Sequence, residues 1–190
     1  MSQAKERPIL FSGPMVRAIL DGRKTVTRRA LKVQPRTKGD IGSYGLGQPF
    51  IRHPDPTKRN PECPYGRPGD RLWVREAWAQ INVAQAPGES WVVYRECDNR
   101  TDYGGPWKPS IHMRRRDSRI LLEITSVHVE RLQEITPNQC IAEGAWRAED
   151  KELGRGHEAI SAFADLWRST GGDWDANPWV WVVEFKRIEP

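Results

Sequence analysis

Basic and hydroxyl side chains crowd together in the octet GRKTVTRR at residues 22 to 29. Thr27 and Arg29 are two residues apart in a run that contains β-branched residues, so in a strand they would share one face. Lys24 and Arg29 are cations that could stabilise the charge that develops on a phosphate during its cleavage. The same octet also fits an ordinary helix stop followed by a solvated strand. Any chemistry here therefore depends on the elements that position these side chains.

Short elements on either side should position the octet. Residues 8 to 12 are a brief apolar run that predicts a strand, and Pro14 suits the first turn of a following helix. Apolar residues recur with helical spacing as far as Leu20, and Gly22 supplies a left-handed stop. The β-branched residues that follow predict a second strand, from residue 25 to 31.

The rest of the chain adds strands and short helices. Thr136 and Pro137 are typical of a helix start, and Gly144 ends that helix. The order contains no regular alternation of strand, helix and strand. This favours the α+β class, with a mixed β-barrel, over a doubly wound sheet. The other expected elements are strands at residues 72–76, 91–94, 120–129 and 179–186 and a helix at 157–169.

Two long basic stretches, residues 32–69 and 98–117, interrupt this order as insertions. The first is full of Gly, Pro, Lys and Arg and has little apolar periodicity, so we expect a long, mobile loop. Their cations could bind the phosphates of a nucleic acid, and a solvated loop is the alternative. The residues concerned are Arg36, Lys38, Arg52, Lys58 and Arg59 in the first stretch and, as the main nucleic-acid-binding candidates, Arg114, Arg115 and Arg116 in the second.

Composition limits the class of protein. The chain has 190 residues and a formal charge of +5, which suits one globular domain with a preference for polyanions. No signal peptide or apolar membrane span is visible. The three cysteines are widely separated, and neither they nor the four histidines show metal-ligand spacing. We therefore expect a cytoplasmic protein with no membrane partner and no metal.

The octet resembles the signature of the ASCH domain family, in which Gly, Lys, a Glu or Thr, and Arg occur at fixed spacing. Lys24, Thr27 and Arg29 fill its positions. The resemblance covers about residues 8 to 188, is strongest to the larger bacterial and prophage members, and implies a single domain over residues 1–190. Three further segments agree in order, namely the turn RPGD at residues 67–70, the short helix at 135–144 and the last strand, WVVEFK, at 181–186.

This resemblance implies a fold and an activity. ASCH proteins are similar to PUA domains, which have a β-barrel with a cleft beside it, and the family is associated with RNA and modified-nucleoside metabolism. Some small bacterial members hydrolyse the amide of acetylcytidine, and we expect neither a metal nor another cofactor here. Their catalytic residues correspond to Lys24 as base, Thr27 as nucleophile and Glu143 as the acid that protonates the leaving nitrogen.

Substrate would be held by further residues near the cleft. Arg29 would orient it through its planar guanidinium, and Arg23, Trp73 and Arg75 are further substrate-binding candidates. The partner is expected to be RNA or a modified nucleoside. Two other functions remain open from the sequence: a binding module that grips RNA without breaking a bond, and a ribonuclease. The oligomeric state is open as well.

Overall fold

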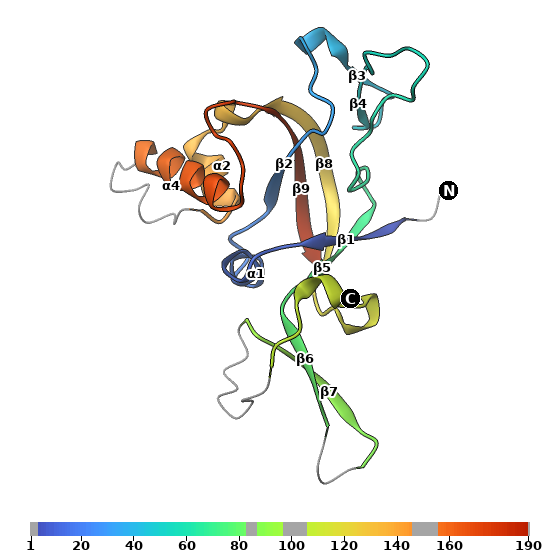
Figure 1. Cartoon of the computed structure of the whole chain (residues 1–190), viewed down its shortest axis with the longest axis vertical. Helices are drawn as coiled ribbons and strands as arrows, with labels where there is room; N and C mark the ends of the chain where they lie inside the picture. Colours follow the sequence, from blue (N-terminus) through green and yellow to red (C-terminus); the bar gives the residue numbers. More distant parts are fainter. Residues whose placement is uncertain (1–3, 83–86, 97–105, 146–155, 190) are drawn as a thin grey trace.

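The protein is described by a computed structural model that places residues 4–82, 87–96, 106–145 and 156–189. Its centre is a curved five-stranded sheet with the strand order β1-β5-β8-β9-β2 (Figure 1). Strands β1 and β5 are parallel, and the other neighbours are antiparallel. The strands are β1 (Glu6–Leu10), β2 (Val26–Ala30), β5 (Arg71–Arg75), β8 (Leu121–Arg131) and β9 (Trp179–Ile188).

The sheet is buried on both faces along β9, and this explains why β9 is a continuous apolar run instead of an alternating one. Val180 and Val182 face a cluster that contains residues of two helices, α2 (Pro137–Ala142) and α4 (Gly156–Ser169). Trp181 and Val183 face a second cluster. The second cluster also holds residues of helix α1 (Gly13–Leu20), so helices cover both sides of the strand.

The helices and the sheet strands lie close to where the sequence predicts them. Pro14 occupies the first turn of α1, and Gly22 beyond its end has a φ of 73°, as expected for a left-handed stop. Thr136 caps α2 by accepting a hydrogen bond from the amide of Gln139 at 3.4 Å. No helix within the described ranges is long and apolar enough to cross a membrane.

The sheet is open at β1 and β2. These are the two edge strands, and in the described part of the chain no strand ladder joins one to the other. The fold is therefore a mixed α+β fold of strands with a few short helices. Among the described residues, no hydrogen-bonded ladder closes the sheet into a barrel. One contact does span the gap: Arg29 Nη2 donates to the carbonyl oxygen of Leu10 at 2.8 Å.

The first insertion, residues 32–69, is not the unstructured loop that its composition predicts. It contains a 3-10 turn (Lys38–Asp40) and a hairpin of β3 (Ile41–Ser43) and β4 (Pro49–Ile51). Ile51 is fully buried in the same cluster as α1 and β9. The prediction failed because isolated apolar residues among many turn residues show no periodicity. The structure nevertheless packs several of them against the core, namely Ile51 with Val33, Ile41, Cys63 and Tyr65.

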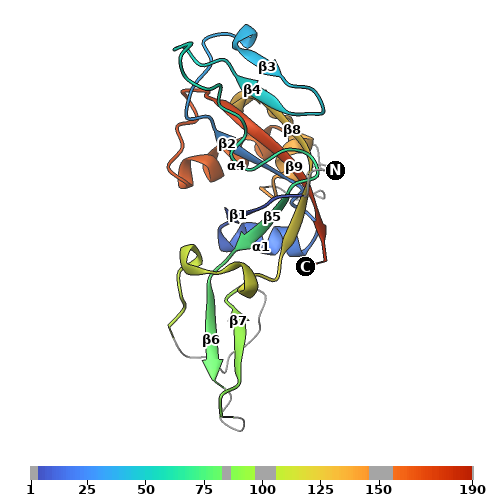
Figure 2. The same ribbon diagram turned by 90° about the vertical axis from the view of Figure 1, so that its right-hand side faces the viewer.

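A second hairpin, β6 (Trp78–Asn82) with β7 (Ser90–Tyr94), projects from the opposite end of the molecule (Figures 1 and 2). The sequence predicts β7 but stops the preceding strand before β6. Of the second insertion, residues 98–105 lie outside the described residues. The remainder forms two 3-10 turns, Ser110–His112 and Arg115–Asp117.

If the first insertion belongs to the core, Ile51→Ala should lower the free energy of unfolding by about 2–5 kcal/mol, because it leaves a cavity under the hairpin. Urea denaturation followed by tryptophan fluorescence measures this loss. Ile111→Ala is the matched control, since Ile111 is 55% exposed and its truncation should change stability by about 0.5 kcal/mol or less. Equal losses in both variants would contradict the packing of the insertion described above.

Candidate active site

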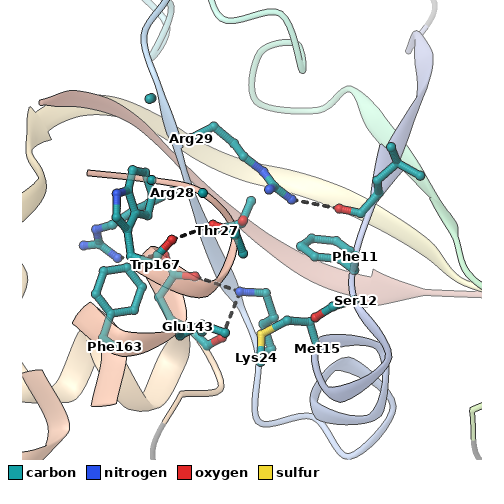
Figure 3. Close-up of a pocket in the computed structure, with 16 residues that line it drawn as sticks. Phe11, Ser12, Met15, Lys24, Thr27, Arg28, Arg29, Glu143, Phe163 and Trp167 are labelled. Atoms are coloured by element: carbon teal, nitrogen blue, oxygen red, sulfur yellow. Dashed lines mark hydrogen bonds and ion pairs between the residues drawn. The ribbon is translucent and has the colours of Figure 1, made fainter. Parts of the chain in front are cut away.

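A cavity of about 310 Å³ lies between β2, the segment that joins β1 to α1, and helix α4 with the turn after it (Figure 3). We call it the site cavity. It brings together Lys24, Thr27, Arg29 and Glu143, which are the four best-supported residues of the sequence prediction. Its other lining residues are Leu10, Phe11, Ser12, Met15, Arg28, Ala30, Phe163, Leu166, Trp167, Thr170, Gly171 and Gly172.

Lys24 is an enclosed cation of the site, with 2% of its side chain exposed. Its Nζ donates two hydrogen bonds to Glu143, to Oε2 at 2.7 Å and to the carbonyl oxygen at 2.8 Å (Figure 3). It donates a third to the Val26 carbonyl at 2.8 Å. Three acceptors match the three protons of an ammonium group. The arrangement therefore holds Lys24 in its charged form at rest.

The backbone turn after α1 delivers Lys24 to this position. The amides of Arg23 and Lys24 both donate to the Ala18 carbonyl, which folds the chain back over the end of the helix. Thr25 then donates to the carbonyl of Ala142, the last residue of α2. The end of α2 is thereby held beside the start of β2.

Gly144 permits this close approach. It has a φ of 78°, and a Cβ at this position would lie 2.8 Å from the Cβ of Ala18 and 3.3 Å from the Cβ of Lys24. Glu143 directly before it caps the C-terminus of α2 and is 3% exposed. A glycine thus lets the carboxylate and the lysine meet from two elements that are 119 residues apart in sequence.

Arg28 is a component of the site that the sequence reasoning missed. Its side chain is completely buried and donates from Nη1 to Glu143 Oε1 at 3.1 Å. Its Nε and Nη2 donate to Glu130 Oε1 on β8, at 2.9 Å and 2.5 Å. A signal was present in the sequence, because Arg28 shares a strand face with the apolar Val26 and not with Thr27 and Arg29.

Glu143 therefore bridges two buried cations, and Glu130 supplies a second carboxylate to Arg28. Burial lowers the pKa of Lys24 from its ordinary value of 10.5; the Glu143 carboxylate opposes this, and the charges of Arg29 and Arg28 add to the lowering. Burial works to raise the pKa of Glu130, but His128 and Arg28 outweigh it and hold that pKa below its usual range.

Thr27 and Arg29 lie on the other face of β2, as their spacing predicts. Phe11 lies under the cations there: its ring centroid is 5.4 Å from Lys24 Nζ and 5.5 Å from Arg29 Cζ. Arg29 Nε is buried and finds no acceptor among the described residues. This N–H is a donor that no group in the described part of the fold satisfies.

The other three substrate-binding candidates do not line the site cavity. Arg23 is exposed and pairs with Asp21 at 3.0 Å. Trp73 lies in β5 and is 8% exposed, and the guanidinium of Arg75 lies 4.7 Å from the centroid of its ring. Proximity in sequence to the octet or to the RPGD turn did not bring these side chains to the cavity.

Arg114, Arg115 and Arg116 also lie away from the lining of the site cavity. Each has an acidic neighbour: Arg114 pairs with Asp117 at 3.0 Å, Arg115 with Glu6 at 2.6 Å, and Arg116 with Asp117 at 3.7 Å. Their side chains remain between 38% and 70% exposed. A role in nucleic-acid binding stays a prediction, and local ion pairing weakens its electrostatic basis.

Comparison of the chain with protein-family models, with curated proteins and with solved structures found no match. The ASCH and PUA-like resemblance accordingly stays a prediction from the residues. Within the described residues, no three His, Cys, Asp or Glu side chains lie together where they could hold a metal ion.

The bridging role of Glu143 predicts unequal effects on stability. Glu143→Gln should lower the free energy of unfolding by about 3–5 kcal/mol. It leaves Lys24 buried without a negative partner, and it removes one of the two carboxylates that pair with Arg28. Lys24→Met should cost less, since Arg28 still neutralises Glu143 and the new side chain fills the same space. Urea denaturation of both variants measures the difference. A larger loss in Lys24→Met would contradict the bridge.

Proposed function

We propose that this protein hydrolyses the amide of an N-acylated nucleoside, acetylated cytidine or a close relative, and that it is an ASCH-type member of the PUA-like superfamily. The observation that carries the proposal is the buried Lys24–Glu143 pair, 2.7 Å apart, in the same cavity as Thr27. The curvature of the sheet and the Arg29 contact between its edges support a PUA-like barrel.

The size and lining of the site cavity suit a planar base. A volume of about 310 Å³ is at the lower end of the range for small-molecule sites. Phe11 and Trp167 offer aromatic surfaces, and Phe163 and Met15 add apolar walls. A nucleoside could stack on such walls while its amide faces the charged end of the cavity.

Catalysis would begin with a proton transfer inside the resting ion pair. The proton moves from Lys24 Nζ across the 2.7 Å hydrogen bond to Glu143 Oε2, which leaves a neutral amine and a neutral acid without changing the total charge. Burial and the neighbouring arginines favour the neutral amine, as the lowered pKa of Lys24 indicates. A turn about the Cε–Nζ bond then presents the lone pair to Thr27.

The amide bond would break in two steps. Thr27 Oγ1 attacks the carbonyl carbon while Lys24 takes the hydroxyl proton, and Arg29 Nε–H donates to the oxygen on which negative charge develops. Glu143 then protonates the departing nitrogen, which releases the free amino group of the base and leaves an ester on Thr27. Lys24 passes its proton back to Glu143 and takes one from water, and the hydroxide adds to the ester carbon. The carboxylic acid leaves as Lys24 gives the water proton to the departing Thr27 oxygen, and the proton on Glu143 then returns to Lys24 to restore the ion pair.

A panel of N-acylated nucleosides and short RNAs, incubated with and without chelator, tests this reaction. Wild-type protein should release the free nucleoside and the acid, while Lys24→Arg should abolish turnover, because a guanidinium stays protonated. Thr27→Val should also abolish it, and Thr27→Ser should keep part of the activity. Arg23→Gln is the control, since Arg23 is exposed outside the cavity.

Contrary results would change the proposal in different ways. Wild-type turnover by Lys24→Arg would remove the role of Lys24 as the base. Binding of RNA without turnover of any compound would favour a binding module, and cleavage of the RNA chain would favour a ribonuclease.

The pH dependence of kcat/KM provides an independent check. The Lys24–Glu143 pair works while it holds one shared proton, so activity should fall at high pH as that proton is lost. Because the pKa of Lys24 is lowered, the fall should lie below pH 10.5. Arg29→Gln removes a charge that lowers this pKa and should move the high-pH limb upward, even where kcat itself drops. A high-pH limb that moves to lower pH in Arg29→Gln would contradict the mechanism.

A further inference from the structure

Most of the net positive charge of the protein lies in the first insertion. Residues 32–69 contain seven Lys or Arg and three Asp or Glu, a net charge of +4, against +5 for the whole chain. Arg36, Lys38, Arg52 and Lys58 are exposed there. A charge gathered in a fifth of the chain favours a polyanion at this end of the molecule.

The tip of the β3–β4 hairpin in this insertion presents exposed apolar side chains. Leu46 is 98% exposed and has a left-handed φ of 51°, a conformation that is costly for leucine. Tyr44 is 56% exposed and stacks on Phe50, with ring centroids 4.3 Å apart. Neither the exposure nor the backbone strain helps the fold, so both favour a contact outside it.

A second cavity, of about 200 Å³, lies between the insertion and the end of β2. It shares Arg29 and Ala30 with the site cavity, and its wall includes Val33, Pro61 and Tyr65. Lys32 and Glu62 also line it, and Glu62 is paired with Arg59. A mostly apolar wall with cations beside it suits a planar base joined to a phosphate.

We propose that the insertion binds single-stranded nucleic acid. The Tyr44–Leu46 tip stacks on bases, and the second cavity holds the nucleotide next to the one in the site cavity, with their shared phosphate at Arg29 and Lys32. The acylation of the base in the site cavity rests on the proposed function. The binding of the strand does not depend on it. A lipid surface is a poorer fit, because one leucine and one tyrosine offer little apolar area for insertion.

Fluorescence anisotropy with a labelled single-stranded 12-mer, as RNA and as DNA, measures the contribution of charge. Lys38→Gln/Arg52→Gln should weaken binding on the order of tenfold and reduce the slope of log Kd against log salt by about 1.4, the value for two lost phosphate contacts. The matched control is Lys186→Gln/Arg187→Gln, which removes two exposed cations from β9. Equal effects of the two pairs would overturn the proposal, as would tighter binding to anionic vesicles than to the 12-mer.

The hairpin tip is tested by substitutions that preserve its fold. Leu46→Asn should weaken strand binding while stability stays equal or rises, because asparagine tolerates a left-handed φ better than leucine. Tyr44→Ala should weaken binding roughly tenfold through lost stacking. Ile111→Asn, at another exposed apolar position, is the control. Unchanged affinity in both tip variants would remove the tip from the interface.

Binding and chemistry are separated by two further measurements. The anisotropy is repeated in Thr27→Val, so strand binding is observed even if the proposed hydrolysis does not occur. Wild-type kcat/KM is then compared for acetylcytidine as a free nucleoside and inside the 12-mer. A clear preference for the 12-mer, reduced by Tyr65→Ala without loss on the free nucleoside, is expected. Equal values would overturn the assignment of the second cavity.

Discussion

A carboxylate shared by two buried cations is the constraint on which the site depends. Glu143 accepts from Lys24 on one oxygen and from Arg28 on the other, and all three side chains are almost fully withdrawn from water. Moving such charges out of water costs several kcal/mol for each, and the cost is offset only where every charge is paired. Removing one partner therefore disturbs both the fold and the chemistry.

The same arrangement affects the protonation of Lys24 in two opposite ways. A lysine with three acceptors is stable as an ammonium ion, yet burial and two nearby guanidinium groups lower its pKa. These opposing influences bring the ion pair and its neutral form closer in free energy than they would be in water. In the proposed reaction, moving one proton over this single hydrogen bond would provide both the base and the acid.

The hairpin insertion joins the architecture to the surface. Ile51 attaches it to the main core, and Tyr65 and Val33 border a cavity that meets the site at Arg29. Arg29 also bonds to the Leu10 carbonyl across the two edge strands. One arginine thus lines both cavities and links the two edge strands of the sheet.

Local sequence signals determined the elements and part of the site. Helical spacing, Pro14, Gly22 and the Thr136 cap predicted the helices, and β-branched runs predicted the strands of the main sheet, because these features act through neighbouring residues. The spacing of two also placed Thr27 and Arg29 on one face. The octet residues Lys24, Thr27 and Arg29 do line one cavity, as their order in the signature led us to expect.

Only the tertiary structure decided which charges meet. Arg28 is separated from Glu130 by 102 residues and from Glu143 by 115, and no local pattern reveals that such distant side chains pair. Likewise, Trp73 and Arg75 lie near the RPGD turn in sequence but outside the cavity, and the hairpin of the insertion packs on the core through Ile51 and Ile41. Pairing and burial depend on how the sheet brings distant strands together, a property of the packed chain and not of any segment within it.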